Sequence, residues 1–113
     1  MKAVKAYIRT VKVNEVVQAL EETGVCDMTV IDVMAVGRQA DPKNVKFSIA
    51  LMERYAKVAK LEIVCNDDQI HRILEILRQA AYTGQPGDGI IYVTPVEMAV
   101  KIRTGAVGEE GLL

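Results

Sequence analysis

The chain has 113 residues, of which 50% are apolar and 26% charged, with a formal net charge of −1. A chain of this length forms one domain, residues 1–113, and its balanced charge, one Phe and no Trp give no basic or stacking surface for nucleic acid. No run approaches the ~20 apolar residues that a membrane span requires, so we expect a cytoplasmic protein without membrane insertion.

The first half of the chain is predicted to form a strand, a helix and a second strand. Residues 4–9 alternate apolar and polar side chains, the period-two pattern of a half-buried strand. Asn14 is a suitable N-cap for a helix that Gly24 is placed to end. Residues 28–36 form the second predicted strand.

Residues 37–57 have no clean period of either kind. A loop of this length in a compact domain is normally functional or disordered. The stretch SIALMERYA within it is compatible with a helix, so the segment is interpreted either as loop throughout or as partly helical.

The second half repeats the order of the first. Residues 59–65 alternate again and predict a third strand, and Asn66 with Gln69 resembles a capping box at the start of a helix. The apolar stripe of that helix is Ile70, Ile73, Leu74 and Leu77. The loop TGQPGDG, residues 83–89, precedes a fourth strand, IIYVT. Thr94, Pro95 and Glu97 fit the start of a short helix, and VKIRT fits a final extended piece.

This order predicts an α+β, ferredoxin-like (βαβ-βαβ) antiparallel sheet with both helices on one face. The other face is rich in Val and Ile and has no cover from its own chain. A homo-oligomer with its sheets facing inward would bury it. Cys26 and Cys65 are far apart, without CxxC spacing or a nearby histidine, which favours free thiols over a zinc site or a disulfide.

The glycine loop and three cations are the candidate binding residues. Gly84, Gly87 and Gly89 allow positive φ and a phosphate-binding arrangement of backbone N–H groups. The loop lacks the P-loop pattern, and a plain connecting turn is the alternative. Lys101 and Arg103 share one face of a predicted short strand, and Arg38 follows the second strand. Together these residues could bind a polyphosphate, although each cation alone fits a solvated surface charge.

The sequence resembles the PII signal-transduction proteins, trimeric adenylate sensors of nitrogen and carbon metabolism. The resemblance covers nearly the whole chain and rests on KAYIRTVK, ALEETGVCDMTV, VGRQ, KLEIV and TGQPGDGIIYVTPVEMAVKIRTG, above all on the spacing of TGQPGDG and IRTG. It implies a homotrimer, a T-loop at about residues 37–56, a B-loop at about 82–90 and a C-terminal loop at about 102–113.

The resemblance also implies an adenine-nucleotide site between subunits. Its residues would be Gly37, Arg38, Glu62, Val64, Gly87, Asp88, Gly89, Lys101 and Arg103. Glu62 and Val64 would lie at the adenine and ribose, and Arg103 would reach the phosphates from the adjacent subunit. Gln39 would contact a nucleotide-bound Mg²⁺ and 2-oxoglutarate, and Lys57 and Lys60 are the candidate effector lysines. No obligatory cofactor is implied. The T-loop would contact a partner transporter or enzyme.

Three departures from the family pattern bear on the ligand. Ile90 replaces a lysine that contacts phosphate, and loss of a charge-assisted hydrogen bond costs about 1.5–3 kcal/mol. Lys101 replaces an arginine and cannot make its bidentate fork. Both changes favour ADP or AMP over ATP. Lys57 is shifted by one residue from the family's 2-oxoglutarate lysine, and Leu51 stands where the modifiable tyrosine is expected.

The preferred hypothesis is a PII-like adenylate sensor, with a second effector such as bicarbonate, that is not an enzyme. A typical 2-oxoglutarate and ATP sensor is the alternative within the family. A small phosphotransferase that uses His71, the only histidine, is the alternative of another class. A structural trimer without a ligand is the third.

Overall fold

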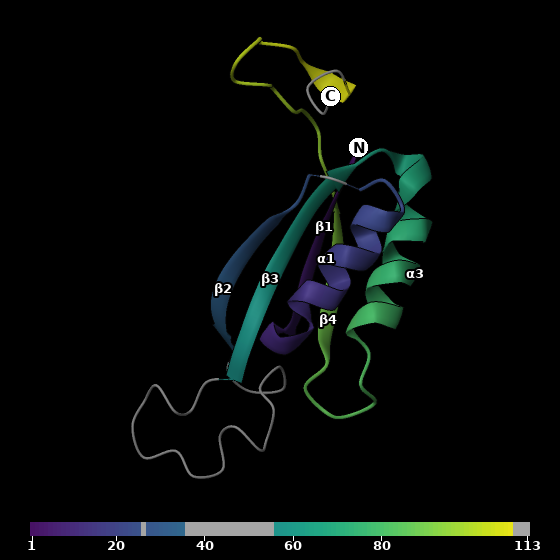
Figure 1. Cartoon of the computed structure of the whole chain (residues 1–113). Helices are drawn as coiled ribbons and strands as arrows, with labels where there is room; N and C mark the ends of the chain where they lie inside the picture. The colour runs from purple at the N-terminus through teal and green to yellow at the C-terminus, as the bar shows by residue number, and fades with distance from the viewer. Residues whose placement is uncertain (26, 36–55, 110–113) are drawn as a thin grey trace.

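The computed structural model describes residues 1–25, 27–35 and 56–109. Two helices cover one face of a four-stranded antiparallel sheet (Figure 1). The strands are β1 (Lys2–Arg9), β2 (Thr29–Ala35), β3 (Ala56–Cys65) and β4 (Gly89–Pro95), in the spatial order β2-β3-β1-β4. The helices are α1 (Val13–Glu22) and α3 (Ile70–Ala81). The predicted ferredoxin-like fold is confirmed.

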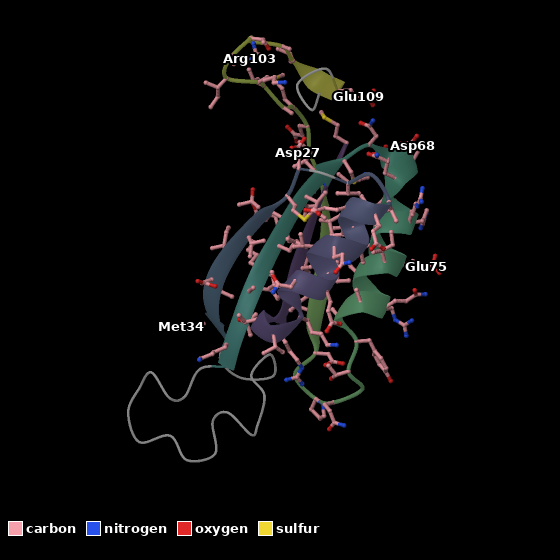
Figure 2. The ribbon with its side chains drawn as sticks, in the orientation of Figure 1. Asp27, Met34, Asp68, Glu75, Arg103 and Glu109 are labelled. Atoms are coloured by element: carbon pink, nitrogen blue, oxygen red, sulfur yellow. The ribbon has the colours of Figure 1, made fainter. Side chains whose placement is uncertain are left out.

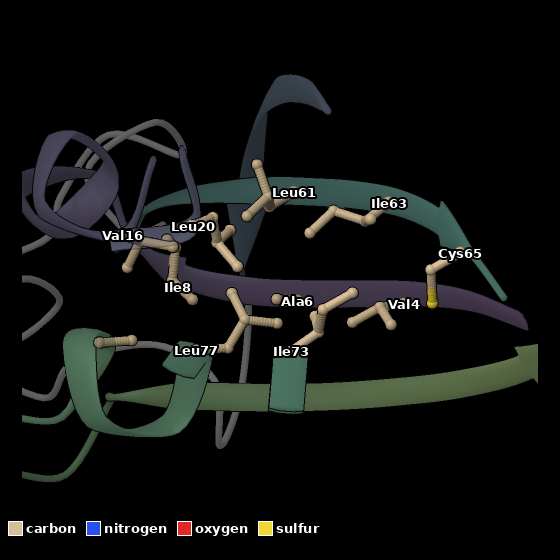
Figure 3. Close-up of a cluster of buried hydrophobic side chains, with 11 residues drawn as sticks. Val4, Ala6, Ile8, Val16, Leu20, Leu61, Ile63, Cys65, Ile73 and Leu77 are labelled. Atoms are coloured by element: carbon tan, nitrogen blue, oxygen red, sulfur yellow. The ribbon is translucent and has the colours of Figure 1, made fainter. Parts of the chain in front are cut away.

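The core lies between β1, β3 and the two helices (Figure 3). Val4, Ala6 and Ile8 of β1 are buried, and they lie opposite Ile63, Leu61 and Ala59 of β3, which are also buried. The helices contribute Val16, Leu20, Ile73 and Leu77 to the same cluster. The alternation predicted for both strands and the apolar stripe of the second helix are therefore confirmed, since each places its apolar side on this core.

The helix ends follow local signals in the sequence. α1 begins at Val13, one residue before the predicted cap Asn14, because a 3-10 turn at Thr10–Lys12 continues directly into it. It ends at Glu22, and the predicted terminator Gly24, with φ of 95°, follows the C-cap Thr23. The Gly24 N–H donates to the Glu21 carbonyl (3.0 Å) and the Val25 N–H to the Leu20 carbonyl (3.1 Å), which is a Schellman motif.

One of the two contacts of the capping pair predicted for the second helix is present, whereas Asn66 Oδ1 is buried without a hydrogen-bond partner. The Asn66 backbone N–H donates to Gln69 Oε1 at 3.0 Å. A 3-10 turn at Asp67–Gln69 then leads into α3. The bond supplies one of the partners that a helix start needs.

The predicted short helix at Thr94–Glu97 is wrong. Thr94 and Pro95 belong to β4, where they pair with Ala3 and Lys2, and the Val96 N–H donates to the Met1 carbonyl at 3.1 Å. Pairing with β1 therefore keeps this segment extended, and the proline is tolerated because β4 is an edge strand.

The predicted strand at VKIRT is replaced by a hairpin, which we call the C-terminal hairpin (residues 99–108). Val100 and Val107 form an isolated antiparallel bridge. The Lys101 N–H donates to the Ala106 carbonyl (2.9 Å), and the Gly105 N–H donates back to the Lys101 carbonyl (2.8 Å). Lys101 and Arg103 therefore lie in and beside a turn and do not share the face of a strand.

The sheet face opposite the helices, called here the outer face, carries exposed apolar side chains as predicted. Register places Ile31, Val64, Ile90 and Tyr92 on it, and all four are exposed. Both described helices lie on the other side (Figure 1). An apolar face of this kind is typical of an interface, and the homotrimer stays a prediction.

Three further expectations concern single residues or segments. Cys65 is a buried free thiol, and burial raises its pKa. Cys26 and the possible helix before Ala56 lie outside the described residues. Among the described helices, none is long and apolar enough to span a membrane.

We predict that Gly89→Ala destabilises the fold. Gly89 has φ of 104°, and an added Cβ would lie 1.8 Å from the Tyr7 carbonyl oxygen of β1, which is held on both sides by neighbouring strands. We expect the free energy of unfolding to fall by more than about 2 kcal/mol, measured by urea titration.

Gly24→Ala is the matched control. Gly24 also has positive φ, but nothing lies within 4 Å of a Cβ at this position. Gly24→Ala should lower the free energy of unfolding by only about 1 kcal/mol, the cost of placing a side chain on a backbone with positive φ. Equal losses in the two variants would contradict the steric explanation.

Candidate functional site

The B-loop (residues 82–90) folds around its own carboxylate, Asp88. Asp88 Oδ2 accepts the backbone N–H groups of Thr83 (2.8 Å) and Gly84 (2.9 Å). Asp88 Oδ1 accepts Arg9 Nε (3.0 Å) and the Thr83 hydroxyl. Arg9 Nη2 also donates to the Pro86 carbonyl at 2.7 Å. An arginine at the end of β1 and an aspartate just before β4 thus hold the loop together.

These contacts fix the charge of Asp88. Partial burial alone would raise the pKa of its carboxyl group, but hydrogen bonds from Thr83, Arg9 and Gly84 outweigh it and hold the pKa well below its usual range. The carboxylate is therefore ionised at neutral pH.

The glycines of the B-loop take the backbone conformations expected of them. Gly84, Gly87 and Gly89 have φ of 83°, 98° and 104°. The N–H groups of Thr83 and Gly84, however, donate to Asp88. These two N–H groups are therefore already hydrogen-bonded to Asp88. A bound anion would have to use other groups of the loop.

Glu62, Val64 and Lys101 line a cleft of about 980 Å³ at the other end of the sheet. Asp27 and Glu109 also line it, and Figure 2 shows them at the end of the molecule that carries Arg103. The structure thus brings together the predicted adenine and ribose residues and one predicted phosphate cation.

Lys60 and Glu62 form an ion pair on the outer face. Lys60 Nζ lies 2.6 Å from Glu62 Oε1 and 5.8 Å from the centroid of the Tyr7 ring. Their hydrogen bond lowers the pKa of Glu62 and raises that of Lys60. Lys60 is therefore paired with Glu62 in the single chain.

The two halves of the predicted site do not meet within one chain. Glu62 and Val64 lie opposite Lys5 and Ala3, and Gly89 lies opposite Ile8, so the halves are three to five residues apart along β1. At about 3.4 Å per residue, this is a separation of about 10 to 17 Å along the strand. Figure 1 shows the B-loop and the C-terminal hairpin at opposite ends of the sheet.

The predicted effector lysines point to opposite faces. Lys57 shares the helix-facing register of Ala59, whereas Lys60 lies on the outer face. Val58, which the register places on the outer face, is only 5% exposed. Lys57 thus lies within β3, which begins at Ala56, and not in a loop. Gly37, Arg38 and Gln39 lie outside the described residues.

Sequence reasoning missed the roles of Arg9 and Thr83 in the B-loop. A signal for Arg9 was present, since in this fold β1 and β4 pair antiparallel and the last residue of β1 lies beside the residue that precedes β4. Across the described ranges, no group of three His, Cys, Asp or Glu side chains could hold a metal ion. His71 is exposed on α3 and does not line the cleft of Glu62, Val64 and Lys101.

We predict that Asp88→Asn lowers the free energy of unfolding by about 1.5–3 kcal/mol at pH 7, because the amide NH2 cannot accept the donors that one carboxylate oxygen now accepts, and the bonds to the remaining oxygen lose their charge. The pKa of Asp88 is lower in the folded chain than its unfolded value of about 3.9, so its stabilisation is present above that value and is lost as pH falls below it. Urea titrations should give a constant difference between wild type and variant above about pH 5 and a smaller one at about pH 3. A difference independent of pH would contradict this assignment.

The family model for nitrogen regulatory protein P-II matches residues 1–106. A nitrogen regulatory protein P-II of Azospirillum brasilense is 38% identical over 112 residues, which cover 99% of this chain and all of the relative. That of Pyropia yezoensis is 37% identical over 116 residues with the same coverage.

A solved structure is also similar. The crystal structure of Arabidopsis thaliana PII bound to citrate matches with a TM-score of 0.81 and 30% identity, over 97% of this chain and 90% of that one. The family match, the relatives and the fold agree with the motifs in the sequence. The chain therefore belongs to the P-II family of nitrogen regulatory, signal-transduction proteins.

Proposed function

We propose that this protein binds an adenine nucleotide in clefts between the subunits of a homotrimer, with ADP or AMP favoured over ATP. Occupancy of the clefts is transmitted through the T-loop (residues 37–56) to a partner transporter or enzyme. The observation that carries the proposal is the separation of the site into two halves, the B-loop and the cleft at Glu62, Val64 and Lys101.

A neighbouring subunit can complete what one chain lacks. The two halves lie about 10 to 17 Å apart along β1, on strands that flank it on opposite sides, and a second chain could place its own cleft beside this B-loop. The exposed apolar outer face favours assembly with the sheets facing inward, which would bring chains side by side. The Arabidopsis relative was solved bound to citrate, a small polyanion, which supports anion binding by this fold.

The position of the B-loop suits signalling. β2 ends at Ala35 and β3 begins at Ala56, and these residues pair at the end of the sheet where β4 leaves the B-loop. A ligand at the B-loop would therefore lie near both ends of the T-loop. Differential affinity of the ligand for two T-loop states would supply the free energy of the signal.

The phosphate preference follows from Ile90. Its side chain is 43% exposed, lies opposite Tyr7 on the outer face and offers no charge. Lys101 provides a point charge without the fork of an arginine. A nucleotide with fewer phosphates loses less binding free energy through the changes at Ile90 and Lys101.

The second effector is proposed to be a small anion such as bicarbonate. Lys57 faces the helix side, and Val58 is buried at the neighbouring outer-face position. This arrangement disfavours 2-oxoglutarate as a co-ligand, and any Mg²⁺ would bind with the nucleotide. We also propose that the protein is a regulator without catalytic activity.

Calorimetric titration with ATP, ADP and AMP tests the proposal. Wild type should bind ADP or AMP more tightly than ATP, and 2-oxoglutarate with Mg²⁺ should leave the affinities unchanged. Bicarbonate in parallel titrations tests the second effector. Tight ATP binding that 2-oxoglutarate enhances would instead indicate a typical nitrogen sensor, and no binding would leave a structural trimer.

Ile90→Lys tests the origin of the preference. A restored lysine should raise ATP affinity about tenfold or more, with a smaller effect on AMP, because one charge-assisted hydrogen bond is regained. Gln18→Lys adds the same charge on the exposed face of α1 and serves as the control. Equal responses of the two variants would show that overall charge, and not position 90, sets the preference.

A further inference from the structure

We propose that Arg9 is a positioning residue that holds the B-loop in its ligand-binding form. This inference rests on the proposed nucleotide site. Arg9 Nε donates to Asp88 (3.0 Å) and Nη2 to the Pro86 carbonyl (2.7 Å). One guanidinium thus ties together the residues on both sides of Gly87.

The Arg9–Asp88 pair is better shielded than an ordinary surface ion pair. The side chains of Arg9 and Asp88 are 15% and 24% exposed. Exposed pairs contribute little because water and salt screen them, whereas a partly buried, charge-assisted pair with good geometry is stronger. The contact is therefore suited to holding a loop in place.

Arg9 belongs to a rigid element and the B-loop does not. β1 is paired with β3 and with β4 along nearly its whole length. The B-loop contains glycines with positive φ, for which many other conformations are open. The contact of its tip with β1 orders the loop in advance. Ligand binding then has a smaller conformational-entropy cost to offset.

Arg9 acts on the rest of the B-loop through Asp88. The carboxylate balances the charge of the guanidinium and passes the restraint to Thr83 and Gly84, whose N–H groups it accepts. Arg9 therefore acts through Asp88 and is not counted among the phosphate ligands. It follows that loss of Arg9 weakens binding of every adenine nucleotide by a similar factor.

Two variants test this role in nucleotide binding. Arg9→Ala should weaken ADP and ATP binding by about tenfold each, with their ratio unchanged within about twofold, and Arg9→Lys should recover part of the loss because it keeps one donor. Arg72→Ala, on the exposed face of α3, removes an arginine elsewhere and should bind as wild type does. A selective loss of ATP binding would make Arg9 a direct phosphate ligand, and unchanged affinities would remove it from the site; either result overturns the proposal.

Hydrogen exchange without nucleotide separates this inference from the proposed function. The amides of Thr83 and Gly84 should exchange at least about tenfold faster in Arg9→Ala than in wild type, while amides of the β1–β3 ladder keep their protection. If wild type binds no nucleotide, the proposed function fails and this readout still tests the restraint. Arg9→Gln, which keeps the side-chain length, replaces Arg9→Ala if that variant does not fold. Unchanged exchange at Thr83 and Gly84 would overturn the proposal.

Discussion

The pairing of β1 on both of its edges is the constraint on which the rest of the structure depends. β3 and β4 take their register from this strand, so Ile8 lies opposite both Ala59 and Gly89. Alternate residues of β1 enter the core under the helices, and the residues between them face away. The same register brings Arg9, at the end of the strand, to the start of β4. The core, the uncovered outer face and the order of the B-loop are thus consequences of one strand's position.

This geometry is compatible with the proposed signalling role. The B-loop and the ends of β2 and β3 lie together at one end of the sheet, and the cleft of Glu62 and Val64 lies at the other. In the proposed trimer, a ligand would join the two ends across a subunit boundary. The free energy of ligand binding would then depend on trimer assembly, on the B-loop and on the T-loop. Such coupling between a ligand site and a second site is what a regulator requires.

The sequence predicted those features that short-range patterns determine. Period-two alternation identified β1 and β3, the apolar stripe identified α3, and Gly24 ended α1 where expected. The predicted helix after Thr94 failed because a cap and a proline also fit an edge strand, and pairing with β1 decided between them. The contact of Arg9 with Asp88 joins residues 79 positions apart, so only the topology could reveal it. The separation of the site into two halves likewise follows from the strand register, which cannot be predicted from the motifs.

The most direct test of a site shared between subunits is complementation between two defective chains. Asp88→Asn impairs the B-loop half and Arg103→Ala impairs the hairpin half, so each homotrimer should bind ADP weakly. Co-refolded mixtures, purified by two different tags, should regain clefts of wild-type affinity, because some clefts then combine an intact B-loop with an intact hairpin. Mixed trimers that bind no better than either parent would contradict the account, since both halves would then act within one chain.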